Sequence, residues 1–424
     1  MSNTVPEGWR EGAIGDVVSS MEGGVSVNSE NRPPNLNEYG ILKTSSVVDG
    51  YFRPSECKAI LPAEIGRAKV NPKQGAILFS RMNTPALVGQ SGYVDKDFLR
   101  TFLPDRLWQI TIRREFNSRW FSYLLRCDST VRHIADAATG TSGSMKNISK
   151  PSLLGIPVCI PPLPEQQKIA AILSSVDDVI EKTRAQIDKL KDLKTGMMQE
   201  LLTKGIGPNG APHTAFKDSP VGRIPEGWEC RRIGELFSVQ LGKMLSKASK
   251  VGDSPLPYLG NKNVQWGRVD LTNLQVMDFN ERERKRFLLS KGDLLMCEGG
   301  DIGRSAIWEC ELSECYYQKA IHRLRVLEGR YEPRLLLEYM RFAKAQGLLT
   351  EYVSQTSIAH LTKEKLESVP VPVPPLSEQR KIVGLIASTD KKITAIEDRH
   401  AKLESLKKAL MQDLLTGKVR VKVD

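Results

Sequence analysis

Apolar residues recur at alternating steps of four and three residues in a long stretch after Pro164. The positions of this seam are Ile169, Leu173, Val176, Ile180, Thr183, Ile187, Leu190, Lys194, Met197 and Leu201. This spacing is typical of a helix that packs along one narrow apolar stripe, as in a coiled coil. The pattern predicts a single long helix with Pro164 in its first turn and Gly205 at its end.

A second stretch, near the end of the chain, repeats this seam in the same register. Its positions are Ile382, Ile386, Thr389, Ile393, Ile396, His400, Leu403, Lys407, Leu410 and Leu414. Equal seams predict that the two helices pair, and a pseudo-twofold repeat requires the pair to be antiparallel. We expect Ser377 to be the N-cap of the second helix and Gly417 to stop it. About forty residues at about 1.5 Å each make a rod of roughly 60 Å.

The coiled-coil positions that carry this prediction are the aliphatic ones: Ile169, Leu173, Ile180, Ile187, Leu190, Ile382, Ile386, Ile393, Ile396, Leu403 and Leu410. Two polar residues, His400 and Lys407, also fall on the seam. A polar seam residue can set the register of a coiled coil. A solvated edge of the seam is the alternative, and the sequence leaves both open.

Two shorter motifs recur with the helices. Val5-Pro6-Glu7-Gly8-Trp9 returns as Ile224-Pro225-Glu226-Gly227-Trp228, and the segment 156–169 returns as 369–382. Between these motifs, segments 20–150 and 240–365 resemble each other only faintly, as in Tyr39 and Lys43 against Tyr258 and Lys262. We interpret the chain as a duplicated frame that carries two divergent heads, with simple drift as the alternative.

Each head shows mixed signals. Segments 75–80 and 292–297 are typical of short buried strands, whereas 120–134 and 333–352 have helical spacing. The predicted class is therefore α+β, with two globular heads alternating with two long helices. The expected boundaries are 1–160 for the first head, 161–205 for its helix, 206–222 for a Gly- and Pro-rich linker with an exposed His213, 223–373 for the second head and 374–424 for its helix.

Composition adds limits to this picture. The 424 residues have a net charge of +11, a mild excess that suits a polyanionic partner without proving one. There is no run of about 18 apolar residues and no signal-peptide pattern in the sequence. The seven cysteines are scattered, which predicts reduced thiols. We therefore expect a soluble, cytoplasmic chain without a membrane partner.

Motifs of catalysis are missing from the sequence. It contains no GxxxxGK[ST] phosphate loop, no HExxH, no metal-spaced His and Cys cluster and no Asn-Pro-Pro-aromatic motif of adenine methylation. We therefore predict no catalytic centre, no metal site and no bound cofactor.

Candidate nucleic-acid contacts lie in the loops of the heads, where amide, hydroxyl and cationic side chains mix. Asn suits adenine, and Lys and Arg suit guanine. The candidates are Tyr39, Lys43, Thr44, Arg81, Ser142, Lys146 and Asn147 in the first head, and Tyr258, Asn261, Lys262, Asn263, Arg304, Ser357 and His360 in the second. Both tyrosines could equally be core residues. The basic run at 281–287 is either a set of phosphate contacts or, as we favour, a solvated helix face.

The tandem arrangement resembles a known family. Two variable segments, each opened by PEGW and closed by IPPLPEQQKIA or VPPLSEQRKIV before a heptad helix, are similar to the specificity subunit of type I restriction-modification systems over essentially the whole chain. The resemblance implies that each variable segment is a target recognition domain that reads one half of a bipartite, asymmetric site in double-stranded DNA. It also implies that the paired helices set the gap between the halves.

The family further implies partners. The helices would dock two modification (methyltransferase) subunits that bind S-adenosylmethionine, and restriction subunits that use ATP and Mg would join through them. The specificity chain itself would be non-catalytic. The competing interpretations are a two-headed protein-binding scaffold without DNA specificity and an enzyme with an unrecognised site. Salt-sensitive duplex binding would distinguish the first of these from a DNA-binding subunit.

Overall fold

The computed structural model describes residues 5–140, 145–245, 255–352 and 360–423. The chain forms two compact units. The first unit comprises Met1–Ala185 and Asp398–Asp424, and the second comprises Gln186–Glu397. Each unit therefore contains one head together with parts of both long helices.

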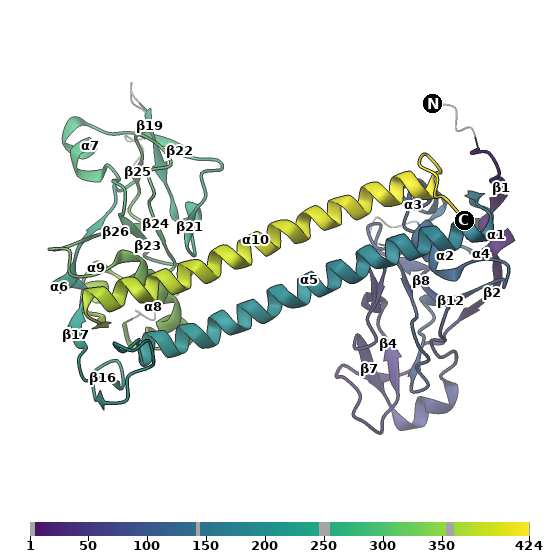
Figure 1. The fold of residues 1–424 in the computed structure, drawn as a ribbon, viewed down its shortest axis with the longest axis horizontal. Coiled ribbons are helices and arrows are strands. Elements are labelled where there is room, and N and C mark those ends of the chain that lie inside the picture. The colour runs from purple at the N-terminus through teal and green to yellow at the C-terminus, as the bar shows by residue number, and fades with distance from the viewer. Residues whose placement is uncertain (1–4, 141–144, 246–254, 353–359, 424) are drawn as a thin grey trace. The chain divides into compact units, whose positions relative to one another are not determined.

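The two long helices occur where the heptads predict them. Helix α5 runs over Leu163–Thr203 and α10 over Leu376–Leu415, and within each unit the segments of the two helices lie side by side (Figure 1). The aliphatic seam positions are all buried or partly buried. The fully buried ones are Ile169, Leu173, Ile180, Ile187, Ile382, Ile386 and Ile393, and the partly buried ones are Leu190, Ile396, Leu403 and Leu410. The predicted helix pairing is confirmed.

Ion pairs show that the helices are antiparallel. In the second unit, Lys191 pairs with Glu397 at 2.7 Å and Lys194 with Asp390 at 2.5 Å, so the α10 partner moves back as α5 advances. In the first unit, the early α5 residue Leu173 shares a core with Leu414 near the end of α10. Both units thus have the antiparallel pairing that the repeat predicts.

The long helices end where the glycines predicted, but the predicted N-cap of α10 is wrong. Gly205 and Gly417 adopt φ values of +65° and +70° just after α5 and α10, a conformation that glycine enters readily and that stops a helix. Ser377 is not the N-cap of α10, because the helix already begins at Leu376. The carbonyl of Pro375 instead accepts the first hydrogen bonds, from the N–H of Glu378 at 2.9 Å and of Gln379 at 3.0 Å. A proline at this position lacks a side-chain cap, but its carbonyl remains available.

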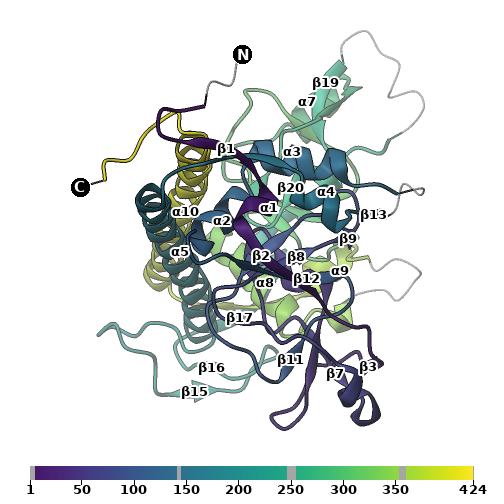
Figure 2. The ribbon, with the colours of Figure 1, turned by 90° about the vertical axis from the view of Figure 1, so that its right-hand side faces the viewer.

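The first head contains two sheets and short helices. An antiparallel sheet has the order β10-β8-β12-β2, and a second sheet has the order β11-β4-β7-β3; Figure 2 shows β2, β12 and β8 side by side. The strands of the first sheet are β2 (Val18–Gly23), β8 (Ile77–Ser80), β10 (Ser91–Tyr93) and β12 (Leu107–Ile112). Those of the second are β3 (Ser29–Glu30), β4 (Gly40–Leu42), β7 (Cys57–Ile60) and β11 (Thr101–Phe102).

The helices of the first head differ in one respect from the expectation. The helical spacing over 120–134 corresponds to two helices, α2 (Ser118–Leu124) and α3 (Asp128–Ala137), because the chain turns at Cys127. The smaller helices are α1 (Ile14–Val17) and α4 (Lys150–Leu154). The buried strand expected at 75–80 is confirmed as β8.

The second head repeats this topology. Its first sheet has the order β24-β23-β26-β18, which matches the first head strand for strand, and its second sheet has the order β25-β19-β22. The strands are β18 (Phe237–Leu241), β19 (Pro255–Leu259), β22 (Gln275–Asp278), β23 (Leu294–Cys297), β24 (Ser305–Ile307), β25 (Tyr316–Tyr317) and β26 (Ile321–Val326). The helices are α6 (Ile233–Leu236), α7 (Glu281–Phe287), α8 (Pro333–Ala345) and α9 (Lys363–Ser368). Two heads with faintly related sequences thus share one α+β fold.

A turn and hairpin present in both heads show that Lys43 does not align with Lys262, as the sequence comparison had suggested. The 3₁₀ turn η1 (Thr44–Ser46) and hairpin β5–β6 (Val47–Val48, Tyr51–Phe52) return as η4 (Asn261–Asn263) and β20–β21 (Val264–Gln265, Arg268–Val269). Thr44 therefore corresponds to Asn261, which shifts the alignment of this region by two positions from that of the PEGW motifs. Lys262 consequently corresponds to Ser45 and not to Lys43.

The core of each head continues into the seam of the helices. In the first unit, Ile77 and Trp120 of the head share one cluster with Leu173 and Leu414. In the second, Leu324 and Leu336 share a cluster with Leu201 and Ile382. All seven cysteines are free thiols. Among the described residues, no helix combines the length and apolar content needed to cross a bilayer.

Candidate functional site

The recurring PEGW motif contacts the recurring proline bracket in the first unit. Strand β1 (Arg10–Ala13), which follows Trp9, pairs with β14 (Pro157–Ile160). The indole Nε1 of Trp9 donates to Glu165 Oε2 at 3.0 Å, and Arg420 donates to both carboxylate oxygens. Burial by itself would raise the pKa of Glu165, but hydrogen bonds from Arg420 and Trp9 outweigh burial and lower it. Glu165 is thus held as a carboxylate.

The second unit repeats this contact with a different third partner. Strand β17 (Glu229–Arg232) pairs with β27 (Pro370–Val373), and Trp228 Nε1 donates to Glu378 Oε2 at 3.1 Å. The backbone N–H of Ile206 donates to Glu378 Oε1 at 2.7 Å, and His213 Nε2 lies 3.1 Å from the same oxygen. The expectation of an exposed His213 is therefore wrong, because the linker folds back onto the start of α10. We call these two contacts the Trp–Glu clamps.

The glutamine that follows each clamp residue holds a helix of the head. Gln166 Oε1 accepts from the N–H of Asn117, the N-cap of α2, at 2.9 Å. Gln379 Oε1 accepts from the N–H of Glu332, the N-cap of α8, at 2.8 Å. The Glu-Gln pair of each bracket therefore attaches both the entry strand and a helix of its head to the long helix. These motifs are structural, and they position the variable loops.

Candidate contact residues of the first head meet where its strands end. Strand β9 (Met82–Asn83) directly follows β8 and pairs with β13 (Lys146–Asn147). Arg81 Nε donates to the carbonyl of Asp105 at 2.7 Å, and one guanidinium nitrogen of Arg81 lies 3.5 Å from Asn147 Oδ1. We call Arg81, Asn83, Asp105, Lys146 and Asn147 the end surface of the first head.

The second head has a surface at the same place in its topology. After β23, Gly299 forms a bridge with His360, as β9 does with β13. Arg304 donates to the carbonyl of Asn261 at 2.8 Å, and Asn261 Nδ2 donates to the carbonyl of Gly299 at 3.1 Å. We call Asn261, Gly299, Arg304, Lys319 and His360 the end surface of the second head.

Backbone hydrogen bonds show that the two end surfaces correspond. The N–H of Arg81 donates to the carbonyl of Arg106 at 3.1 Å, and the N–H of Glu298 donates to that of Ala320 at 2.9 Å. Each bond joins the residue after the central strand to the residue before the neighbouring strand, β12 or β26. The same loops therefore converge in both heads, but they carry different side chains.

The remaining candidates lie elsewhere. Tyr258 and Asn263 are 3% and 2% exposed: the hydroxyl of Tyr258 donates to Gln275, and the amide of Asn263 bonds the backbone of Gly260 and Asp270. Their inclusion as base contacts is corrected, because both side chains are used inside the fold. Ser142 and Ser357 lie outside the described residues.

Three candidates of the first head, Tyr39, Lys43 and Thr44, are not among the residues of its end surface. Tyr39 is partly buried, and its ring packs against Phe102 and under Arg100. Lys43 Nζ lies 3.7 Å from a Glu56 carboxylate. Thr44 opens η1 as Asn261 opens η4, and Lys262 is exposed in η4.

Sequence reasoning missed Asn83, Asp105 and Lys319. Asp105 and Lys319 lie in the turns that lead into β12 and β26, and Lys319 is exposed. Asp105 and Lys319 could have been identified by their position in a turn that leads into a buried strand, since such turns lie at the end of a sheet, where other loops meet. Each end surface offers amide groups that both donate and accept, together with cations. Among the described residues, no group of His, Cys, Asp or Glu side chains is arranged to hold a metal ion.

Comparisons with known proteins agree with one another. The family model described as "Type I restriction modification DNA specificity domain" matches residues 6–192 and again 225–405, once for each repeat. The chain is 25% identical over 428 residues to the type I restriction enzyme MjaVIII specificity subunit of Methanocaldococcus jannaschii, covering 99% of this chain and 94% of the relative. It is 21% identical to the EcoKI specificity subunit of Escherichia coli K12, covering 98% and 90%.

Solved structures show the same fold. The S subunit of a type I restriction-modification system from M. genitalium has a TM-score of 0.58 at 16% identity, covering 98% of both chains. A chain from a study of complex assembly and conformational transition of the type I R-M system has a TM-score of 0.57 at 19% identity, covering 98% of this chain and 100% of that chain.

Proposed function

The chain belongs to the family of type I restriction-modification DNA specificity subunits, and we propose that its two heads read the two halves of one bipartite duplex target. The function of this family is DNA sequence recognition rather than catalysis. Each end surface would contact the bases of one half-site. The paired helices would set the gap between the halves.

One observation carries this proposal: the two end surfaces occupy the same place in one shared fold but present different groups. Arg81, Met82 and Asn147 in the first head are replaced by Glu298, Gly299 and His360 at the corresponding positions. A scaffold that is kept while its loop side chains differ supports two readers of unlike sequences. The expected target is therefore asymmetric.

The chemistry of the side chains supports base reading. Asparagine can donate to and accept from an adenine edge, and Lys or Arg can donate to guanine. Asn147 and Lys146 supply these groups in the first head. Asn261, Lys262 and Arg304 supply them in the second. Arg304 donates to Asn261 Oδ1 at 3.2 Å and Asn261 Nδ2 donates to the carbonyl of Gly299, so the amide is held in place and keeps one hydrogen and one lone pair for a base.

The partners are part of the proposal. Two modification subunits would dock on α5 and α10, and restriction subunits would join through them in the cytoplasm. S-adenosylmethionine would belong to the modification subunit, and ATP with Mg to the restriction subunit, so that this chain binds no cofactor itself. One solved neighbour comes from a study of complex assembly, which supports a role in an assembly of several subunits.

The sharpest test uses one lysine in each head. Lys146→Ala in the first head and Lys262→Ala in the second should each weaken the affinity for one half-site by about 1–3 kcal/mol and leave the other half unchanged. The assay is binding of the complex to duplexes in which one half-site at a time is randomised. Loss at both half-sites from either single variant would contradict the assignment of one head to each half. A protein-binding scaffold would show no salt-sensitive duplex binding at all.

A further inference from the structure

Helix α7 of the second head is fastened at its N-terminal end. Asn280 caps it by accepting from the N–H of Glu283 at 2.9 Å. The Nζ of Lys243 donates to Glu283 Oε2 and to the carbonyl of Asp278, both at 2.6 Å. Burial by itself would raise the pKa of Glu283, but hydrogen bonds from Lys243 and from the N–H of Asn280 lower it. Glu283 thus acts as an internal anchor and does not neutralise the outer face of the helix.

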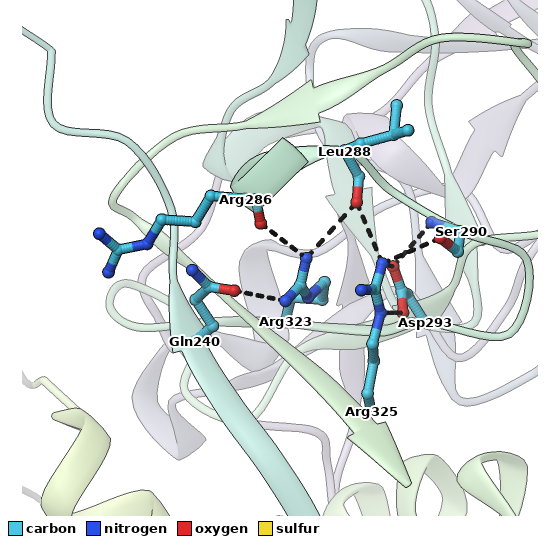
Figure 3. A network of polar contacts seen from close by, with 7 residues as sticks. All are labelled: Gln240, Arg286, Leu288, Ser290, Asp293, Arg323 and Arg325. Atoms are coloured by element: carbon cyan, nitrogen blue, oxygen red, sulfur yellow. Dashed lines mark hydrogen bonds and ion pairs between the residues drawn. The ribbon is translucent and has the colours of Figure 1, made fainter. Parts of the chain in front are cut away.

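Two arginines of strand β26 fasten the other end (Figure 3). Arg323 donates to the carbonyls of Arg286 at 3.0 Å and Leu288 at 3.4 Å, and to Gln240 Oε1. Arg325 donates to both oxygens of Asp293 and to the carbonyl of Leu288 at 3.0 Å. These bonds occupy carbonyl groups that the end of a helix leaves without partners.

The network includes a buried charge without a carboxylate partner. Arg323 is 6% exposed, and burial lowers the pKa of its guanidinium. Among the described residues it bonds only carbonyl and amide oxygens, whereas its neighbour Arg325 has Asp293. Burying a charge in this way is unfavourable. The C-terminal end of α7 is therefore held by a guanidinium whose burial is itself unfavourable.

The outer face of α7 is cationic. Arg282, Lys285 and Arg286 are exposed and stand at positions i, i+3 and i+4, which places them on one side of the helix. In Figure 3 the side chain of Arg286 points away from Arg323. In the part of the chain that the structure describes, none of the three forms an ion pair with a carboxylate, although Glu281 precedes Lys285 by four residues. Like charges at this spacing destabilise a short helix.

The N-terminal end of α7 is linked through Lys243 to the end surface of the second head. Lys243, which anchors α7, accepts at its carbonyl from the N–H of Lys319 at 2.8 Å, and Lys319 belongs to that surface. In the first head, the segment at the corresponding place is the 3₁₀ turn η2 (Pro62–Arg67), where Arg67 is paired with Glu64 at 2.6 Å. The cationic helix is therefore a property of the second head alone.

We propose that Arg282, Lys285 and Arg286 of α7 bind the phosphate backbone of the DNA beside the half-site that the second head reads, with Arg323 and Arg325 as positioning residues. The proposal rests on the DNA-recognition function proposed above. It replaces the favoured interpretation of this run as a merely solvated helix face. Fixed cations on one face suit phosphates, which need charge in a defined place but no base identity. Helix α7 would thus add affinity for duplex DNA to the second head without adding sequence preference.

The test is the salt dependence of duplex binding by the full-length chain in complex with its modification subunit. The variant is R282Q/K285Q/R286Q. Three lost phosphate contacts should reduce the slope of log K against log [salt] by about 2.7. The affinity advantage of the unchanged chain should then fall by about 40-fold between about 50 and 200 mM salt. Cognate and unrelated duplexes should lose affinity alike.

A matched control removes the same net charge elsewhere. The variant K204Q/K217Q/R223Q alters three exposed cations of the linker region, at the same cost of three charges. Its salt slope should stay at the value of the unchanged chain. An equal fall in both variants would mean that net charge alone acts, and this would overturn the proposal.

Further outcomes separate this proposal from the function it rests on. An unchanged salt slope in the α7 variant, while the parent complex binds DNA, would refute only the role of α7. Weaker assembly with the modification subunit at an unchanged slope would assign the face to a protein partner and refute the proposal as well. Absence of salt-dependent DNA binding by the parent complex would instead refute the proposed function. As a check on positioning, Arg323→Gln should reproduce part of the slope change and raise amide exchange in 281–290, and exchange without a slope change would contradict a positioning role.

Discussion

Replacing Lys407 by methionine should destabilise the first unit more than the equivalent change destabilises the second. Lys194 and Lys407 are equivalent seam residues of the two long helices, and each pairs with an aspartate of the other helix, Asp390 or Asp177. The Lys407 pair is the more buried, with side-chain exposures of 8% and 19% against 13% and 45% for the Lys194 pair. Because both are Lys–Asp pairs, a difference between the two variants reports the effect of burial.

The magnitudes follow from burial and from the partners that remain. Removing one member of a fully buried pair costs about 3–5 kcal/mol, whereas an exposed pair contributes about 0–1 kcal/mol. After Lys407→Met, Asp177 keeps the hydroxyl of Tyr123 as a donor at 2.7 Å. We therefore expect a loss between these limits, about 2 kcal/mol, for Lys407→Met. For Lys194→Met we expect about 0.5–1 kcal/mol, because Asp390 is largely hydrated.

Hydrogen exchange measures each unit separately, which matters because a chain of two units need not unfold in one step. Peptides from 400–411 should lose protection by about 30-fold in Lys407→Met, and peptides from 386–396 by less than about 6-fold in Lys194→Met. The double variant D177N/K407M, which leaves Tyr123 an acceptor, should recover most of the loss. Equal losses in both units, or simple additivity in the double variant, would show that the buried Lys407–Asp177 pair contributes no more than the exposed one.

Two further predictions concern carboxyl groups with little exposure: those of the Trp–Glu clamps and that of Glu338 in α8. Glu378→Ala should lower the stability of the second unit by about 2–4 kcal/mol in chemical denaturation, because Trp228 Nε1 and the N–H of Ile206 lose their acceptor. Glu165→Ala should act alike on the first unit. A loss below about 0.5 kcal/mol would contradict a stabilising role of the Trp–Glu clamps. Burial raises the pKa of Glu338, so its folded form holds a proton more tightly than its unfolded form and stability falls as the pH rises through the raised pKa. Glu338→Gln should therefore stabilise the second unit at pH 8 and make little difference near pH 4, and an equal effect at both pH values would exclude Glu338 as the titrating group.

The two long helices and the twofold repeat could be predicted from sequence, because heptad spacing is a short-range pattern and the repeated motifs can be aligned directly. The heptads predicted α5 and α10 almost to the residue, and Gly205 and Gly417 marked their ends. The same reasoning failed where a long-range contact decides. His213 looked like an exposed linker residue, yet Glu378, 165 positions away, holds it.

The end surfaces were only partly predictable for a related reason. Arg81, Lys146 and Asn147 were expected as contacts and do meet, since Arg81 follows the buried strand β8 and β13, formed by Lys146 and Asn147, pairs with β9 just after it. In the second head, Tyr258 and Asn263 were expected to contact DNA but face the interior, because a one-residue change along a strand or turn reverses the direction of a side chain. The faint match of Lys43 with Lys262 was misplaced by two positions, which no pattern in such divergent segments could reveal. Polar residue type indicates a binding loop, but only the fold shows which of its side chains are free.

Recognition of a split DNA target can be measured as a map of DNA methylation across the host genome by long-read sequencing, with and without this gene. A specificity subunit with two heads should direct its modification partner to one split motif, and deletion of the gene should abolish methylation at that motif alone. Lys262→Ala should then alter one half of the motif and preserve the other half and the gap. Loss of a continuous, undivided motif, or no change together with no bound methyltransferase in a pull-down of this chain, would contradict the account.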